Sequence, residues 1–274
     1  MDNPVDFAGR VALVTGGTRG IGRAITEAFL GAGAEVVVCG RTEPAEPPSV
    51  DGRPAGFVAA DVRDPEQARA LIDAVVERHG RLDVLVNNAG GSPTADAATV
   101  SPRFVERIVA LNMLAPFYVA QPANAVMQRQ DSGGSIVNIG SVAGRDPEPG
   151  TAAYAAAKAG LAHFSRALAV EWAPKVRVNH ITTGLILTDS AAEYYGEDGG
   201  AAVAATIPMR RMAVPADVAA ACLYLASPLA GYVTGADLAV HGGGEVPARW
   251  LAARGSGLPD LSDLSDLSGL SGPE

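Results

Sequence analysis

Cysteine, histidine, lysine and the aromatic residues are scarce in the 274-residue chain, and most of these scarcities bear on the class of protein. The two cysteines, Cys39 and Cys222, form neither a CxxC pair nor a disulfide framework, so we expect a cytoplasmic protein. Four scattered histidines show no HxH or HExxH spacing, so we expect no metal site. Only two residues are lysines, Lys158 and Lys175. Aromatic residues make up 5% of the chain against 32 glycines, which suits helices packed on a sheet better than an all-β sandwich.

Positive charge is also in deficit. The net charge is −9, of which four negative charges fall in residues 255–274, and this balance argues against nucleic acid or an anionic membrane as partner. The first ten residues contain no basic and apolar leader pattern. The uncharged stretches Ile108–Gln128 and Val218–Ala236 contain proline and polar groups. We interpret them as buried or interface helices with loops, and not as membrane spans.

Short apolar runs alternate with longer helical patterns along the chain. The expected strands are Val11–Thr15, Glu35–Cys39, Phe57–Ala60, Leu82–Val86, Ser135–Ile139, Val176–Ile181 and Asp237–Val240. The expected helices are Arg19–Leu30, Pro65–His79, Pro102–Met127, Ala152–Trp172 and Ala216–Leu225. Apolar strands alternating with helices predict an α/β fold, with a doubly wound parallel sheet of about seven strands between two helical layers. Such a sheet binds ligands at the carboxyl ends of its strands.

The chain is expected to form a single domain over residues 1–250. Residues 42–56 are proline-rich and predict a loop. Residues 251–274 repeat "DLS" and "GLS", which predicts a low-complexity, disordered tail. The alternative is a tail that docks on a neighbouring subunit through its leucines.

A glycine-rich loop follows the first expected strand. Gly16, Gly20 and Gly22 have the spacing GxxxGxG and stand directly before a helix. Glycines there allow a tight turn and let the backbone approach a pyrophosphate at the helix N-terminus. The alternative is a turn that only packs the helix against the sheet.

The end of the second strand bears on the choice of dinucleotide. No carboxylate stands in Val38-Cys39-Gly40-Arg41 to bind a ribose 2′-hydroxyl, and Arg41 follows the strand at once. Arg19 in the glycine loop adds a second guanidinium, and two arginines favour a 2′-phosphate, hence NADP over NAD. Both arginines could instead be solvated surface residues. Glu43 lies close to the end of the same strand, so NAD remains the alternative cofactor.

Tyr154 and Lys158 stand four residues apart in the alanine-rich stretch "GTAAYAAAKAG", with Thr151 as the expected N-cap. Residues i and i+4 share one face of a helix. A nearby ammonium favours the phenolate, so we expect a lowered Tyr154 pKa and a phenol suited to acid–base chemistry. The alternative is an exposed pair without chemistry.

Ser141 follows the expected strand Ser135–Ile139, where its hydroxyl could bond a substrate oxygen. The surrounding "NIGSVAG" is not GxSxG, because Ile139 occupies the first glycine position, and a hydrolase elbow is not supported. Asn112 lies in the long central helical region, near Pro116.

These motifs together resemble the short-chain dehydrogenase/reductase family, in its single-domain subgroup. The resemblance rests on TGGTRGIG (15–22), Asp61-Val62, NNAG (87–90), Asn112, Ser141 and Tyr154-x-x-x-Lys158, and it covers about residues 8–245. It implies a Rossmann-type fold. It also implies that Ser141, Tyr154 and Lys158 act together, with Asn112 holding a water relay to the lysine.

The resemblance further implies a set of cofactor contacts. They are Gly16, Thr18, Arg19, Gly20, Ile21, Gly22, Arg41, Asp61, Val62, Asn88, Ala89, Gly90, Tyr154, Lys158, Gly184, Ile186 and Thr188. Two positions depart from the family pattern. Thr183 replaces a proline before Gly184, which should loosen that turn. His241 stands where the family often has an acidic residue, and we expect it to affect subunit contacts more than chemistry.

The expected function is NADP(H)-dependent interconversion of a ketone and a secondary alcohol, with Tyr154 as general acid/base. Lys158 would lower the tyrosine pKa and bind the nicotinamide ribose. The segment 189–211 should cap the substrate with Tyr194, Tyr195 and Met209, which favours a small, apolar or neutral carbonyl compound such as a 3-oxoacyl thioester. The alternatives are a non-catalytic dinucleotide-binding sensor or structural subunit, and an acyl hydrolase using Ser141. Family members are commonly tetramers, so we expect a homotetramer built on the uncharged central helices, with a dimer as alternative.

Overall fold

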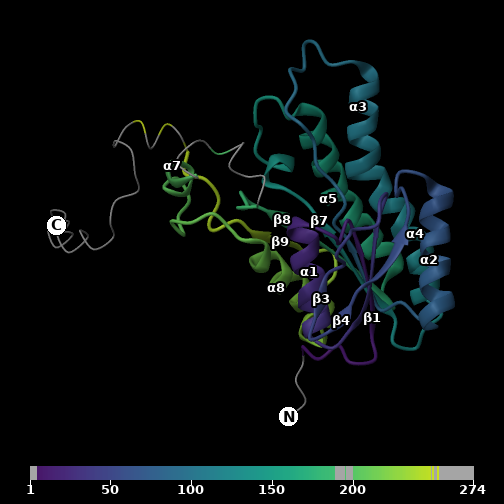
Figure 1. The fold of residues 1–274 in the computed structure, drawn as a ribbon. Helices are drawn as coiled ribbons and strands as arrows, with labels where there is room; N and C mark the ends of the chain where they lie inside the picture. The colour runs from purple at the N-terminus through teal and green to yellow at the C-terminus, as the bar shows by residue number, and fades with distance from the viewer. Residues whose placement is uncertain (1–4, 189–194, 196–199, 248, 250–251, 253–274) are drawn as a thin grey trace, which may run out of the picture.

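Seven parallel strands form the central sheet of the protein, in the order β5-β2-β1-β6-β7-β8-β9 (Figure 1). This computed structural model describes residues 5–188, 195, 200–247, 249 and 252. The strands are β1 Val11–Thr15, β2 Glu35–Gly40, β5 Gly56–Ala59, β6 Val84–Asn87, β7 Gly134–Ile139, β8 Val176–Thr183 and β9 Asp237–Val240. The central strands β1, β6 and β7 are buried almost throughout, as expected for a sheet covered on both faces.

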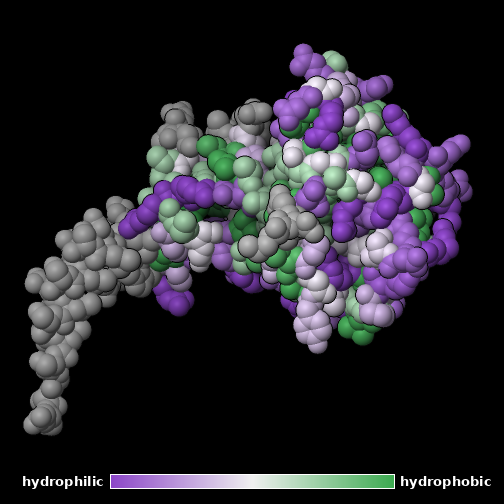
Figure 2. Space-filling view, turned by 90° about the horizontal axis from the view of Figure 1, so that it is seen from below, coloured by the Kyte–Doolittle hydropathy of each residue, from purple (hydrophilic) through white to green (hydrophobic). Residues whose placement is uncertain are grey.

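Helices cover both faces of the sheet. They are α1 Gly20–Gly31, α2 Pro65–His79, α3 Pro102–Val109, α4 Ala115–Met127, α5 Ala152–Trp172, α7 Ala201–Ala204 and α8 Pro215–Ala226. One apolar cluster joins α1 and α8 to one face, and a second joins α2, α4 and α5 to the other. The two clusters confirm the expected three layers. Hydrophilic side chains dominate the side of the molecule that carries α2 (right in Figure 2).

The long central helix is the first difference from the sequence prediction. The expected helix Pro102–Met127 is interrupted by a π-helical turn, Ala110–Leu114. Pro116 has no N–H to donate to the carbonyl of Asn112 four residues earlier, so regular α-helical bonding fails there. The turn places the Asn112 side chain in the interior, where it is 0% exposed.

Two local predictions also need correction. The predicted loop 42–56 contains a short antiparallel pair, β3 Ser49–Val50 and β4 Arg53–Pro54, which turns at Asp51 and Gly52, both with positive φ. Thr151 stands at the N-cap position of α5, but its hydroxyl donates to the Glu148 carbonyl and does not cap the helix.

None of the helices in the described part of the chain is long and apolar enough to cross a membrane. The predicted tail 251–274 lies outside the described residues, apart from Ala252.

Candidate active site

The candidate site lies at the carboxyl edge of the sheet. The chain runs from β1 outward to β2 and β5, and then returns to the other side of β1 as β6. This reversal of strand order leaves a crevice between the loops after β1 and β6, the usual place for a ligand in an open α/β sheet.

The glycine loop after β1 can only be built from glycine at its tightest points. Gly16 and Gly20 have φ of 63° and 52°, which L-residues rarely adopt. A Cβ on Gly22 would lie 2.2 Å from the Gly16 carbonyl oxygen and 2.5 Å from Asn88 Nδ2. Thr18 and Arg19 complete the loop, and α1 starts directly at Gly20. A bare backbone that leads into a helix N-terminus fits the pyrophosphate of a dinucleotide.

Asn88 ties the ends of β1 and β6 together. Its Nδ2 donates to the Thr15 carbonyl at 2.9 Å. In return, the Thr15 hydroxyl accepts from the backbone N–H groups of Asn88 and Ala89, both at 3.0 Å. The expected cofactor residues 88–90 are therefore held directly beside the glycine loop.

Asn112 links the π-helical turn to the loop after β6. Its Oδ1 accepts from the Gly91 N–H at 2.8 Å, while Nδ2 donates to the carbonyls of Gly91 and Ile108 at 3.0 and 2.9 Å. A Cβ on Gly90 would lie 2.8 Å from Asn112 Oδ1 and 3.2 Å from Lys158 Nζ. The structure thus brings Asn112, Lys158 and Gly90 together, as the sequence predicted.

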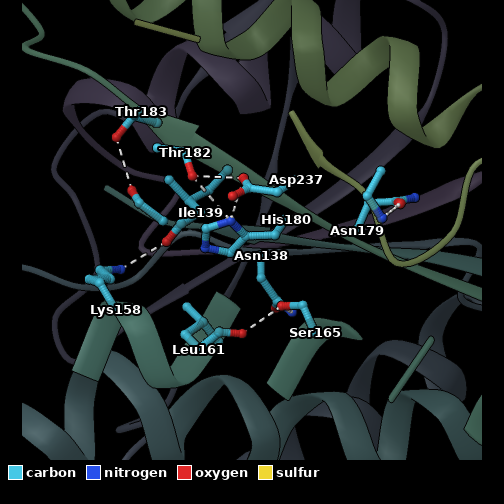
Figure 3. A network of polar contacts seen from close by, with 12 residues as sticks. Asn138, Ile139, Lys158, Leu161, Ser165, Asn179, His180, Thr182, Thr183 and Asp237 are labelled. Carbon is cyan, nitrogen blue, oxygen red and sulfur yellow. Dashed lines mark hydrogen bonds and ion pairs between the residues drawn. The ribbon is translucent and has the colours of Figure 1, made fainter. Parts of the chain in front are cut away.

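Lys158 is buried, although it carries an ammonium. Its Nζ donates to the Ile139 carbonyl at 2.8 Å and lies 5.7 Å from the centre of the Tyr154 ring (Figure 3). Burial lowers the pKa of Lys158 from 10.5 to about 8. A lysine with this pKa titrates close to neutral pH, which suits it to proton transfer.

Ser141 and Tyr154 meet at the end of β7. Ser141 Oγ accepts from the Ala143 N–H at 3.2 Å and is hydrogen-bonded to Tyr154. The expected lowering of the Tyr154 pKa is not seen. Burial raises the pKa of Tyr154 above 10, and the bond to Ser141 offsets only part of that rise. The burial of the phenol in this fold, which the spacing alone does not reveal, is the largest cause of this rise.

The expected adenine contacts lie at the neighbouring strand ends. Arg63 Nε donates to Asp61 Oδ1 at 2.9 Å, and this bond lowers the pKa of Asp61. Arg41 also acts on Asp61 electrostatically, so the two lie close together. Val62 is buried, whereas Arg19 and Arg41 are exposed after the adjacent strands β1 and β2. None of these four expected contacts lines the cleft beside Tyr154.

A cleft of about 1360 Å³ opens beside Ser141 and Tyr154. Its walls include the expected cofactor residues Ile21, Gly184, Ile186 and Thr188. The sequence argument missed Arg145 and Glu148 in its wall, although their position after β7 was a signal.

Four residues at or after the end of β8 bear on further sequence predictions. Thr183 does not leave a loose turn, because its hydroxyl donates to the Gly140 carbonyl at 2.9 Å. His241 lines the cleft, and its expected effect on subunit contacts stays a prediction. Tyr195 lines the cleft as well, whereas residues 189–194 and 196–199 of the predicted cap, including Tyr194, lie outside the described residues. Met209 is 62% exposed.

Among the described residues, no group of three or more histidine, cysteine, aspartate or glutamate side chains could hold a metal ion.

The fold and this site define an NAD(P)-dependent oxidoreductase that acts on CH–OH or ketone groups. The family model described as enoyl-(acyl carrier protein) reductase matches residues 16–245. The chain belongs to the short-chain dehydrogenase/reductase family.

Three relatives illustrate the similarity. An uncharacterized oxidoreductase of Mycobacterium tuberculosis is 40% identical over 240 residues, 85% of this chain and 91% of the relative. The 3-oxoacyl-[acyl-carrier-protein] reductase of Vibrio cholerae is 35% identical over 87% of this chain and 98% of its own length. The solved aldohexose dehydrogenase of Thermoplasma acidophilum superposes with a TM-score of 0.81 at 29% identity, covering 93% of this chain and 98% of that one.

Proposed function

We propose that the protein uses NADP(H) to interconvert a ketone and a secondary alcohol in a small, neutral or apolar compound. The observation that carries the proposal is the meeting of Ser141 and Tyr154 at the cleft, with Lys158 buried behind the Tyr154 ring and beside Gly90. A bound nicotinamide supplies or accepts the hydride. Gly16, Gly22, Asn88 and Thr188 are among the residues that would hold the dinucleotide.

Tyr154 is the proton donor to the carbonyl oxygen in reduction. Its raised pKa keeps the phenol protonated at neutral pH, as a general acid requires. In alcohol oxidation the same oxygen takes the proton back. Ser141, hydrogen-bonded to Tyr154, orients the substrate oxygen and stabilises charge that develops on it.

Lys158 holds the replacement proton next to Tyr154. With a pKa of about 8 it is mostly charged at neutral pH and can still release a proton. Asn112 fixes the loop at Gly91 against the π-helical turn and supports the water relay to Lys158.

NADP preference is supported by Arg19 and Arg41, which lie exposed at adjacent strand ends. The substrate class is supported by the cleft wall, where Arg145 pairs with Asp146 and Glu148 adds negative charge. An anionic substrate would meet repulsion there.

The test is cofactor turnover, with NADPH or NADH, against a panel of ketones and alcohols that includes glucose, threitol and acetoacetyl-CoA. Tyr154→Phe should abolish turnover and keep NADPH binding. Tyr232→Phe is the matched control, because Tyr232 is fully exposed, and it should change nothing. Full activity in Tyr154→Phe would overturn the mechanism. An inactive wild-type protein that binds NADPH would favour the non-catalytic sensor, and labelling of Ser141 by a phosphonate would favour the hydrolase.

We also propose a cytoplasmic homotetramer in which residues 1–250 form the catalytic domain. Both cysteines are free and buried, which suits a reducing compartment. Val170 on α5 is 83% exposed, an apolar side chain that a helix-to-helix contact between subunits would cover. Light scattering after gel filtration tests the assembly, and a monomer would contradict it.

A further inference from the structure

A row of polar side chains crosses the sheet directly below the candidate site. Asn87, Asn138, His180 and Asp237 are register partners on β6, β7, β8 and β9. The Asn87 amide donates to Asn138 at 2.8 Å, and the Asn138 amide donates to Ser165 of α5 at 2.9 Å. Because register partners in a parallel sheet face the same way, His180 lies on the α5 side, which is also the side of Lys158 (Figure 3).

Asp237 fixes the orientation of the His180 ring. Asp237 Oδ1 lies 2.8 Å from His180 Nδ1 and also accepts from the Thr182 hydroxyl at 2.7 Å. A carboxylate at Nδ1 assigns the proton of the neutral ring to that nitrogen. His180 is only 2% exposed, and its Nε2 has no hydrogen-bond partner among the described residues.

The free edge of this ring lies against Gly140. A Cβ added to Gly140 would be 2.1 Å from both Cε1 and Nε2 of His180. Gly140 is also bonded at both backbone groups: its N–H donates to the Ile181 carbonyl at 2.7 Å, and its carbonyl accepts from Thr183 at 2.9 Å. Gly140 is therefore held on three sides by β8.

Gly140 stands between two groups of the candidate site. The residue before it, Ile139, supplies the carbonyl that accepts from Lys158, and the residue after it is Ser141. A shift of Gly140 would move both. Side chains that touch reacting groups stay in place when the residues behind them are locked by packing and hydrogen bonds.

We propose that His180 and Thr183 are positioning residues that set Ser141 and Lys158 through Gly140, with Asp237 orienting His180. The proposal rests on the proposed function for its catalytic consequence. The structural part of the proposal, that β8 holds Ile139 and Lys158 in position, does not depend on turnover.

Kinetics give the first test, with His180→Ala and Thr183→Val, the latter an isosteric loss of one hydroxyl. Both should lower kcat about tenfold or more and change the NADPH Kd much less, because the glycine loop and Asn88 are untouched and only the contact through Lys158 is disturbed. Tyr232→Phe, which removes one hydroxyl from a fully exposed side chain, is the control and should keep full activity. An unchanged kcat in both variants would overturn the proposal.

A double-mutant cycle tests the contact itself. Gly140→Ala alone should reduce kcat and melting temperature, because its methyl group meets the His180 ring. In the His180→Ala background the two contacts of 2.1 Å are removed and only the Ile181 carbonyl oxygen, at 3.0 Å, stays close to this methyl group, so its cost should shrink. Equal cost in both backgrounds would contradict the contact.

A readout free of turnover separates this proposal from the proposed function. The chain has two lysines, so selective ¹⁵Nζ-lysine NMR of the full-length protein gives two signals. Thr183→Val and His180→Ala should change the titration midpoint of Lys158 and leave that of Lys175 alone. An unmoved Lys158 signal would overturn the positioning role even in an active enzyme. A moved signal in a protein without turnover would retain that role and reject the proposed function.

Discussion

Lys158 Nζ donates a 2.8 Å hydrogen bond to the carbonyl of Ile139, the last residue of β7. The bond joins the alanine-rich helix α5 to the strand end that carries Ser141. It compensates only part of the cost of burying the ammonium, since the pKa of Lys158 is lowered to about 8. The protein keeps this destabilising charge beside Tyr154, the residue that we propose exchanges the proton.

Lys158→Met should therefore abolish turnover and raise stability at pH 7. The folded state disfavours the ammonium, so the unfolded chain binds more protons between pH 8 and pH 10.5, and wild-type stability rises across this window. Below pH 8 the buried ammonium destabilises the folded wild type by about 3 kcal/mol. Lys158→Met should gain this free energy of unfolding, less about 1 kcal/mol for the hydrogen bond that it loses. Urea unfolding at pH 7 and pH 10 measures this gain in the free energy of unfolding. The gain should be smaller at pH 10 than at pH 7, and Lys175→Met, at an exposed lysine, should show no such dependence on pH.

Ketone reduction should slow as pH rises through about 8. Lys158 loses its proton in that range, whereas burial raises the pKa of Tyr154 from its ordinary value, so the phenol is still protonated at pH 8. Initial rates with saturating NADPH from pH 6 to pH 10 give the profile. A rate that stays level to pH 10 would contradict a proton-supplying role for Lys158.

Two glycines of α1, Gly22 and Gly31, provide a matched pair of substitutions. Gly22→Ala should destabilise the protein and weaken cofactor binding, because its Cβ would lie 2.2 Å from the Gly16 carbonyl. Gly31→Ala, at the last position of α1, meets open space and should stabilise by about 0.5–1 kcal/mol through helix propensity. Thermal melts and NADPH titration compare the two. Equal effects would mean that the close approach at Gly22 has no special importance.

Asn112→Ala should cost about 2–4 kcal/mol, because three hydrogen bonds of a fully buried amide are lost together. Urea unfolding measures the loss. Asn112→Asp keeps the acceptor for Gly91 and removes the two donated bonds, so it should lie between alanine and wild type unless the buried charge dominates. A loss below about 0.5 kcal/mol in the alanine variant would show that the π-helical turn does not depend on this side chain.

Arg19→Ala and Arg41→Ala should each raise the KM for NADPH about tenfold, since each removes a charge-assisted bond to a phosphate. The KM for NADH should hardly change. Arg69→Ala on exposed α2 serves as the control. A parallel rise for NADH and NADPH would place the arginines away from the 2′-phosphate and reopen the choice of cofactor.

The helices and strands could be predicted closely from the sequence. The ranges Pro65–His79, Ala152–Trp172 and Asp237–Val240 agree with the structure at both ends. Apolar runs and helical periodicity are local properties, and in this chain the tertiary packing follows them. The π-helical turn was missed although Pro116 was visible, because a helical pattern does not reveal where its hydrogen bonds change register.

The residues that meet at the site were also predicted, but their electrostatics were not. Asn112, Ser141, Tyr154 and Lys158 converge as expected, whereas the direction of the Tyr154 pKa shift was wrong. A spacing of four residues places two side chains on one face, but it does not state how deeply the rest of the protein buries them.

By itself the sequence determined the order of strands and helices, the glycine loop and the placement of Tyr154 and Lys158 on one helix face, because each is a local pattern of residue types. Only the tertiary structure decided which groups surround that pair. His180 and Thr183 reach Gly140 from β8, and Asp237 reaches His180 from β9. Both strands follow Gly140 by 36 residues or more, and pairing across the sheet sets these contacts. Burial, which sets the pKa of both Tyr154 and Lys158, likewise depends on all the layers packed around them.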